Sequence, residues 1–170
     1  MKRFFHPILG AAVFAALAGL TIAANPRGTA DLTLNGKKIS VEYGRPSLGG
    51  RTVNELLAQV PADGWRLGAD KSTTFSTTGD LMFGNVKVPK GEYSLWAQKQ
   101  ADGSWKLVFN KQHGQWGTNH DPSQDLVSVP LKTEKESKPA EQVTITLEEE
   151  HGGGEISIQW GDLELSTTFK

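Results

Sequence analysis

The sequence contains no cysteine, and this absence removes several kinds of chemistry. Disulfide bonds, thiolate metal sites, iron–sulfur clusters and cysteine nucleophiles all require that residue. An excess of charge of one sign is also lacking, because 18 Lys and Arg residues stand against 19 Asp and Glu residues. This balance gives no indication of a strongly basic surface, and we expect no nucleic-acid partner.

Motifs that bind common cofactors are missing as well. The chain has no glycine-rich phosphate loop and no dinucleotide fingerprint, so we expect no cofactor. His151-Gly152-Gly153-Gly154 matches the oxyanion-hole tetrapeptide of lipases, but that motif works with a G-x-S-x-G nucleophile elbow, which is absent here. A four-residue hairpin loop at 151–154 is the better interpretation, because it sets Leu147 opposite Ile158 and both are apolar.

Long hydrophobic runs are absent except near the amino terminus. There a positively charged start precedes the almost wholly apolar segment from Ile8 to Ile22, and small residues follow at Ala23 and Ala24. This order is typical of a secretory signal peptide, cleaved after Ala23 or Ala24. The run of about fifteen residues is short for a membrane span, which needs about twenty. We expect residues 1–24 to be removed and residues 25–170 to form one exported domain, periplasmic or secreted, with no membrane span.

Turn dipeptides between alternating apolar runs predict a chain of β-hairpins. The predicted turns are Asn35-Gly36, Gly84-Asn85, Gly161-Asp162 and a five-residue loop at 100–104. The cross-strand pairs that they set are Leu32 with Ile39, Phe83 with Val86, Trp160 with Leu163, and Leu95 with Phe109. Each pair brings apolar side chains together on one face, so the turn and the pattern agree.

Three further segments complete the prediction. Leu126 to Leu131 alternates, but Pro130 places it at a sheet edge. Lys132 to Glu141 is highly charged and is predicted to be a solvated loop. Arg51 to Val60 has apolar residues at helical spacing, which predicts one short helix near residues 52–60 that Pro61 ends. The fold class is therefore all-β: an antiparallel β-sandwich, jelly-roll-like or a partly open barrel, with one short helix.

Candidate metal ligands are few. His113, His120, Asp121 and His151 could offer imidazole and carboxylate groups to a divalent metal. Their spacing matches no tight signature such as H-E-x-x-H. We therefore predict no metal site.

Tryptophan and arginine give the strongest remaining signal. Trp65-Arg66 and Gln115-Trp116-Gly117 lie in or beside loops rather than inside alternating runs. A buried Arg66 would need a carboxylate such as Asp70, or carbonyl oxygens, as a partner. A partly exposed Arg and Trp could instead hold an anionic or sugar ligand through a bidentate fork and stacking.

The same residues carry a resemblance to a known family. The matching segments, between about Val41 and Phe169, are Tyr43 to Pro46, Gly50-Arg51, Trp65 to Ala69, Val88 to Leu95, Trp105 to Lys111, Gln115 to Gly117, Asp121-Pro122 and Asp125. In this order they resemble a bacterial family known as domain of unknown function 2911. The resemblance implies an exported, β-rich protein and carries no established activity. His113 and His120 depart from the family's pattern, which further weakens the metal interpretation.

Seven residues lie on the family's pattern and are the predicted ligand-binding residues: Arg45, Arg51, Trp65, Arg66, Asn110, Gln115 and Trp116. The alternative is that they form a buried network of Arg, Trp and carboxylate groups that fixes the loops. Both interpretations remain open from the sequence, because neither burial nor proximity can be read from it.

Two rival functions follow. The first is an exported, non-catalytic domain that binds a small molecule, a glycan or a protein of the cell envelope, because no nucleophile can be paired with a base. The second is an envelope hydrolase, with or without the assistance of a metal, whose general base is a histidine or a carboxylate; the polar loop from His113 to Asp125 motivates it. A structural or inhibitory subunit of an envelope complex is a third possibility, because a sandwich exposes sheet edges and loops.

Overall fold

The amino-terminal hairpin forms as its turn predicts. The computed structural model describes residues 24–61 and 64–170, so the predicted leader lies outside the described residues except for Ala24. Asn35 and Gly36 have φ angles of +50° and +78° and join strands β1 (Arg27–Leu34) and β2 (Lys37–Gly44). The two strands pair antiparallel, with Leu32 opposite Ile39.

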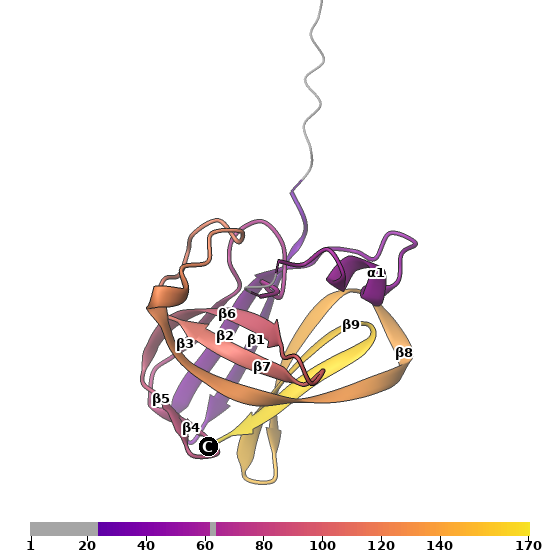
Figure 1. The fold of residues 1–170 in the computed structure, drawn as a ribbon. Coiled ribbons are helices and arrows are strands. Elements are labelled where there is room, and N and C mark those ends of the chain that lie inside the picture. Colours follow the sequence, from indigo (N-terminus) through magenta and orange to yellow (C-terminus); the bar gives the residue numbers. More distant parts are fainter. Residues whose placement is uncertain (1–23, 62–63) are drawn as a thin grey trace, which may run out of the picture.

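The described strands form a seven-stranded sheet in the order β1-β2-β3-β6-β7-β8-β9 and a separate hairpin, β4–β5 (Figure 1). Every pairing is antiparallel. The remaining bounds are β3 (Thr74–Thr77), β4 (Leu81–Phe83), β5 (Val86–Val88), β6 (Gly91–Lys99), β7 (Trp105–Asn110), β8 (Asp125–Glu150) and β9 (Gly153–Phe169). The predicted pairs Phe83–Val86 and Leu95–Phe109 are both present.

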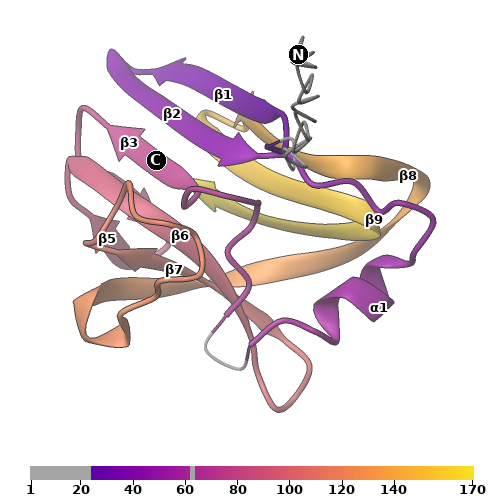
Figure 2. The ribbon, with the colours of Figure 1, turned by 90° about the horizontal axis from the view of Figure 1, so that it is seen from above.

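The sheet curls until its two ends nearly meet (Figure 2). β8 pairs first with β7 and then with β9, and its later part returns to the segment that follows β2. There the backbone N–H of Leu48 donates to the Glu141 carbonyl at 2.8 Å. The N–H of Val143 donates to the Pro46 carbonyl at 3.1 Å. The result is a nearly closed antiparallel barrel, within the predicted all-β class.

Helix α1 (Val53–Leu57) lies at one end of this barrel, beside the bends of β8 and β9 (Figures 1 and 2). Thr52 caps it, because its hydroxyl accepts from the Glu55 N–H while the Glu55 carboxylate accepts from the Thr52 N–H. The helix is shorter than predicted, since a tight turn follows at Ala58. No helix in the two described ranges has the length and apolar character to cross a membrane.

The prediction of a turn at Gly161-Asp162 is wrong. β9 continues through both residues, and Gly161, with φ +59°, forms an irregularity opposite Ala140 of β8. A Cβ at Gly161 would lie 3.1 Å from the Cβ of Val53. Gly161 is thus the place where α1 approaches the strand, and the glycine allows this close approach instead of a chain reversal.

The prediction of a loop from Lys132 to Glu141 is also wrong. β8 runs through it, with Lys132 opposite Ser166 and Lys135 opposite Leu163. The charged residues suggested a solvated loop, and most of their side chains are indeed exposed. The backbone is nevertheless in a strand, because β9 pairs with it along one edge.

The hairpin predicted at 151–154 exists, but its loop has two residues. His151 and Gly152, with φ +47° and +75°, form the turn, and Leu147 pairs with Ile156 instead of Ile158. The shift is by two residues, so the buried face is unchanged.

Candidate functional site

Three tryptophans gather at the α1 end of the barrel. Trp65 stacks on Trp160, with ring centroids 5.6 Å apart and planes 16° apart. It also meets Trp105 edge to face at 6.4 Å. The backbone of Trp65 pairs with Ala97 of β6 through two hydrogen bonds of 2.8 Å. Trp65 is 4% exposed, so it belongs to the core on one side.

On its other side Trp65 helps to line a cleft of about 380 Å³ beside α1. This volume lies within the range of small-molecule sites. Trp65, Trp96 and Trp160 belong to the lining. The charged residues of the lining are Arg51 and Arg66, and no described Asp or Glu belongs to it.

Neither arginine is committed to a described carboxylate. Arg51 is exposed and donates from Nε to the Leu48 carbonyl at 3.2 Å. Arg66 is half-buried, and its side chain crosses Gly117, where a Cβ would lie 2.9 Å from the Arg66 Cδ. Within the described residues no salt bridge joins either guanidinium to a carboxylate. Two unpaired guanidinium groups favour an anion in this cleft.

The loop that carries Arg66 is held on two sides. A Cβ on Gly44 would collide with the carbonyl of Ala69, so the end of β2 packs directly against the loop. On the other side the Gly117 N–H donates to the Asp70 carbonyl at 2.7 Å. Leu67 has φ +55°, an uncommon angle for a bulky residue, and it is fully buried. Packing on both sides therefore holds this backbone in one conformation and keeps Arg66 in place.

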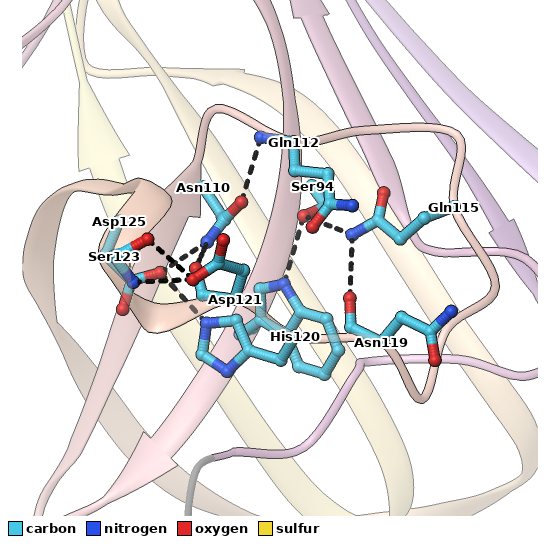
Figure 3. Close-up of polar contacts among 10 residues, drawn as sticks. Ser94, Asn110, Gln112, Gln115, Asn119, His120, Asp121, Ser123 and Asp125 are labelled. Carbon is cyan, nitrogen blue, oxygen red and sulfur yellow. Dashed lines mark hydrogen bonds and ion pairs between the residues drawn. The ribbon is translucent and has the colours of Figure 1, made fainter.

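Asn110 lies in a separate polar cluster on the outer face of β6 and β7 (Figure 3). Its side-chain amide is fully buried and donates to the Asp121 carbonyl at 2.8 Å and to Asp125 Oδ1 at 2.7 Å. Its own oxygen accepts from the Gln112 N–H at 2.9 Å. Asn110 thus ties both ends of the 111–124 segment to the barrel.

His120 belongs to the same cluster. Its Nε2 lies 2.9 Å from Asp125 Oδ1, and its ring stacks on Trp96 with centroids 4.3 Å apart. The His120 side chain is 1% exposed, so it cannot reach a solute. Trp96 is shared between this cluster and the cleft, since it also lines the cleft.

Gln115 links neighbouring segments through the hydrogen bonds of its side chain. Its side-chain oxygen accepts from the Ser72 hydroxyl at 3.3 Å. Its amide donates to Ser94 Oγ at 3.3 Å and to the Asn119 carbonyl at 3.4 Å (Figure 3). These contacts fix the 114–119 loop beside the segment that carries Arg66.

The other two predicted site residues lie outside the cleft lining. Arg45 donates from Nε to the Val143 carbonyl at 3.1 Å and from Nη2 to Thr144 Oγ1 at 3.2 Å, where it helps to close the barrel. The Trp116 side chain is 54% exposed, and its backbone is bridged to Lys71. The structure therefore brings Arg51, Trp65 and Arg66 together, and it places Arg45, Asn110, Gln115 and Trp116 elsewhere.

Two lining residues were missed from the sequence. Trp160 lies on the buried face of β9, and that position by itself indicates a core residue and not a site residue. The position of Trp96 could have been inferred from the sequence. Leu95 and Ala97 point inward, so the large apolar residue between them must point outward. Its 3% exposure shows that the outer face of β6 is covered there.

The histidines do not converge. His113 is 3.7 Å from Glu92, and His151 lies at the exposed turn after β8. No group of three or more His, Cys, Asp or Glu side chains in the described part of the chain is arranged to hold a metal ion. The pKa of Asp121 is lowered, chiefly by hydrogen bonds from the Ser123 hydroxyl and N–H, because Asp121 caps the 3₁₀ helix η1 (Pro122–Gln124).

Fold and site together define an antiparallel β-barrel with a tryptophan- and arginine-lined cleft at its helical end. The chain belongs to the family described as protein of unknown function (DUF2911), whose model matches residues 25–169. No curated protein and no solved structure matches the chain. Four of the segments that carry the family resemblance meet at the cleft, through Pro46, Arg51, Arg66 and Gly117.

Proposed function

We propose that this protein is an exported, non-catalytic binding domain whose cleft beside α1 takes a small organic anion. The observation that carries the proposal is the charge of the cleft. Arg51 and Arg66 line it without a described carboxylate in the lining. An anion with an apolar or aromatic body could pair its charge with the guanidinium groups and pack its body against the tryptophans of the lining.

The rigidity of the site supports binding. Arg66 is held by packing against Gly117, and the indole of Trp65 is held by Trp160 and Trp105. Groups that are ordered before the ligand arrives lose little entropy when it binds. A sugar without charge fits less well, because it would leave two guanidinium groups beside it without a counter-charge.

The first prediction concerns this ligand class. Benzoate should quench the tryptophan fluorescence of the purified protein with a dissociation constant in the millimolar range or below. Benzamide has nearly the same shape without the charge, and it should bind at least about tenfold more weakly. Arg66→Gln and Arg51→Gln should each weaken benzoate binding by about three- to tenfold or more, and titration calorimetry checks the fluorescence values.

Two variants serve as controls. Arg27 lies on β1, is paired with Glu42 at 2.8 Å and is not part of the cleft, so Arg27→Gln should bind benzoate as the wild type does. Trp116→Ala should also leave binding unchanged. Equal binding of benzoate and benzamide, or loss of binding in Trp116→Ala but not in Arg66→Gln, would move the site away from the cleft and contradict the proposal.

The hydrolase alternative gains no supporting observation. Its general base would be a histidine or a carboxylate between His113 and Asp125, but His120 is enclosed by Trp96 and Asp125. Of the carboxylates, Asp125 accepts from Asn110, and Asp121 accepts from the hydroxyl and N–H of Ser123. His113 is accessible, yet its near neighbour is Glu92, and no described serine or threonine forms a hydrogen bond with it. A binding domain is therefore the better proposal than an enzyme.

A further inference from the structure

The first contact of the described chain with the fold is made by Asn25. Its backbone N–H donates to Asp70 Oδ2 at 2.9 Å, and its side-chain amide donates to the same oxygen at 3.3 Å. The next residue is also fixed, since the Pro26 carbonyl accepts from the Arg45 N–H at 2.7 Å. Asn25 is thus anchored beside the cleft, of which it forms part of the lining.

Asp70 is poorly matched to a neutral partner. It is half-buried, its φ is +62°, and its own carbonyl is used by the Gly117 N–H. No Lys or Arg of the described residues forms a salt bridge with its carboxylate. Arg66, the partner that the sequence suggested, is not bonded to it. A partly buried carboxylate gains much more from a cation than from an amide N–H.

The backbone nitrogen of Asn25 is one candidate for that cation. The leader pattern allows cleavage after Ala23 or after Ala24. Only cleavage after Ala24 turns the nitrogen that already contacts Asp70 into a terminal amine. Cleavage one residue earlier would leave the charge on Ala24, about 3.8 Å further along the chain.

We propose that the leader is removed between Ala24 and Asn25 and that the resulting α-ammonium group of Asn25 is the counter-ion of Asp70. A signal peptidase would hydrolyse the Ala24–Asn25 amide, with the water hydroxyl going to the Ala24 carbonyl carbon and a proton to the Asn25 nitrogen. The amine then takes a further proton from solvent at neutral pH. This inference rests on the proposed export, and it is independent of the ligand in the cleft.

The ammonium group changes the cleft as well as the terminus. It neutralises the carboxylate nearest to Asn25, so a bound anion is not repelled there. The charged groups near this nitrogen are Asp70, which contacts it, and Arg51 and Arg66, which line the same cleft as Asn25. A carboxylate close to an amine favours its charged form, and nearby cations disfavour it. Arg27 is engaged by Glu42, and Lys71 is exposed beside Asp70.

The processing site is tested by expressing the full 170-residue chain in a bacterium and measuring the intact mass and N-terminal sequence of the exported protein. A start at Asn25 is the expected result. An exported protein that starts at any other residue overturns this inference and leaves the proposed export standing. A chain that retains its leader inside the cell overturns both.

The ion pair is tested by titrating the α-amine of the exported protein, observed by NMR after ¹³C reductive methylation. Its pKa should lie about one unit above the usual range of about 7.7–8.0. Asp70→Asn should bring the pKa back into that range, while Asp31→Asn, at an exposed position on β1, should leave it raised. A protein made to begin at Ala24 should have an ordinary amine pKa that Asp70→Asn no longer changes.

These variants separate an ion pair from a merely structural role. Loss of fold would not move one amine selectively, and the chain that begins at Ala24 keeps Asp70 intact. If the pKa of the wild-type amine is ordinary, or is the same in Asp70→Asn, the counter-ion assignment fails.

Discussion

The hydroxyl of Tyr43 shows how a single side chain closes the barrel. It is buried, it accepts from the Ile145 N–H at 3.0 Å, and it donates to the Ile145 carbonyl at 3.3 Å. One group therefore serves both backbone atoms of a residue on β8. Without it, those atoms would be buried with no hydrogen-bond partner, because β2 and β8 do not form a regular ladder there.

Tyr43→Phe should consequently lower the free energy of unfolding by about 1–3 kcal/mol, since it leaves a buried N–H and C=O unsatisfied. Urea unfolding followed by circular dichroism measures the change. Tyr93→Phe is the matched control, because the Tyr93 hydroxyl makes a single bond, to the Pro89 carbonyl at 2.8 Å, and should cost about 0.5–1.5 kcal/mol. A larger loss in the Tyr93 variant would contradict the role given to Tyr43.

The β8–β9 hairpin carries like charges directly across its strands. Glu148 is opposite Glu155, and Glu134 is opposite Glu164. The pKa of Glu155 is raised above its ordinary value, chiefly by burial and then by Glu150 and Glu164, while Lys132 opposes the shift. The pKa of Glu164 is raised by burial and by Glu136 and Glu134. This element is therefore less stable when its carboxyl groups are ionised.

Replacing Glu155 by glutamine should stabilise the β8–β9 hairpin at neutral pH. The folded protein binds the Glu155 proton more tightly than the unfolded chain, so stability is lost as the pH rises from the unfolded pKa through the folded pKa. Glu155→Gln should raise the melting temperature at pH 7.5, by an amount corresponding to about 0.2–1 kcal/mol. Differential scanning calorimetry should show the gain shrinking as the pH falls below the ordinary value of 4.5.

Glu42→Gln is the control for that series. Glu42 is paired with Arg27, so its replacement should give no gain at pH 7.5. A gain from Glu155→Gln that persists at low pH would mean that charge is not its cause.

The whole barrel has two differently built ends. At the α1 end, tryptophans line the cleft. At the opposite end, the β4–β5 hairpin lies near the carboxyl terminus (Figure 1), and Met82 and Lys170 exchange two backbone hydrogen bonds of 2.8 and 3.0 Å. Phe169 is 2% exposed there, with its ring centroid 5.2 Å from that of Phe83. Met82, Phe169 and Lys170 also line a surface pocket at this end, so the two ends differ in their lining residues: the cleft at the α1 end carries the tryptophans and the two arginines.

Phe169→Ala should lower the free energy of unfolding by about 3–5 kcal/mol, because Phe169 is buried and its removal leaves a cavity beside the ring of Phe83. The same variant should bind benzoate within about twofold of the wild type, since additive behaviour is expected of distant sites. Phe169→Leu is a milder variant in which binding can be measured if the first unfolds. A tenfold change in affinity in either folded variant would show that the two ends are coupled.

Much of the strand pairing was predictable from local pattern. Asn35-Gly36 and Gly84-Asn85 are turns whose neighbours alternate, so the turn geometry and the apolar faces select the same register. The errors arose where one residue type has more than one use. Gly161 gives α1 close access to a strand, and the charged residues from Lys132 to Glu141 are in a strand whose side chains are mostly exposed.

The candidate site was predictable only in part. Trp65, Arg66 and Arg51 lie on the family's pattern, and they do line one cleft. Asn110 and Gln115 have the same polar character, but burial and hydrogen bonding commit them to holding loops. No local pattern separates these two roles, because the difference lies in which distant segments pack around each side chain.

The sequence by itself determined the all-β class, the short helix and most hairpin registers, because these depend on periodicity and turn geometry within a few residues. It also carried the family's segments in recognisable order. Only the tertiary structure decided that Pro46, Arg66 and Gly117 share a cleft, that His120 is enclosed, and that Asn25 contacts Asp70. Those facts depend on the curl of the sheet and on backbone packing at Gly44 and Gly117, where chain segments far apart in sequence approach without an intervening side chain.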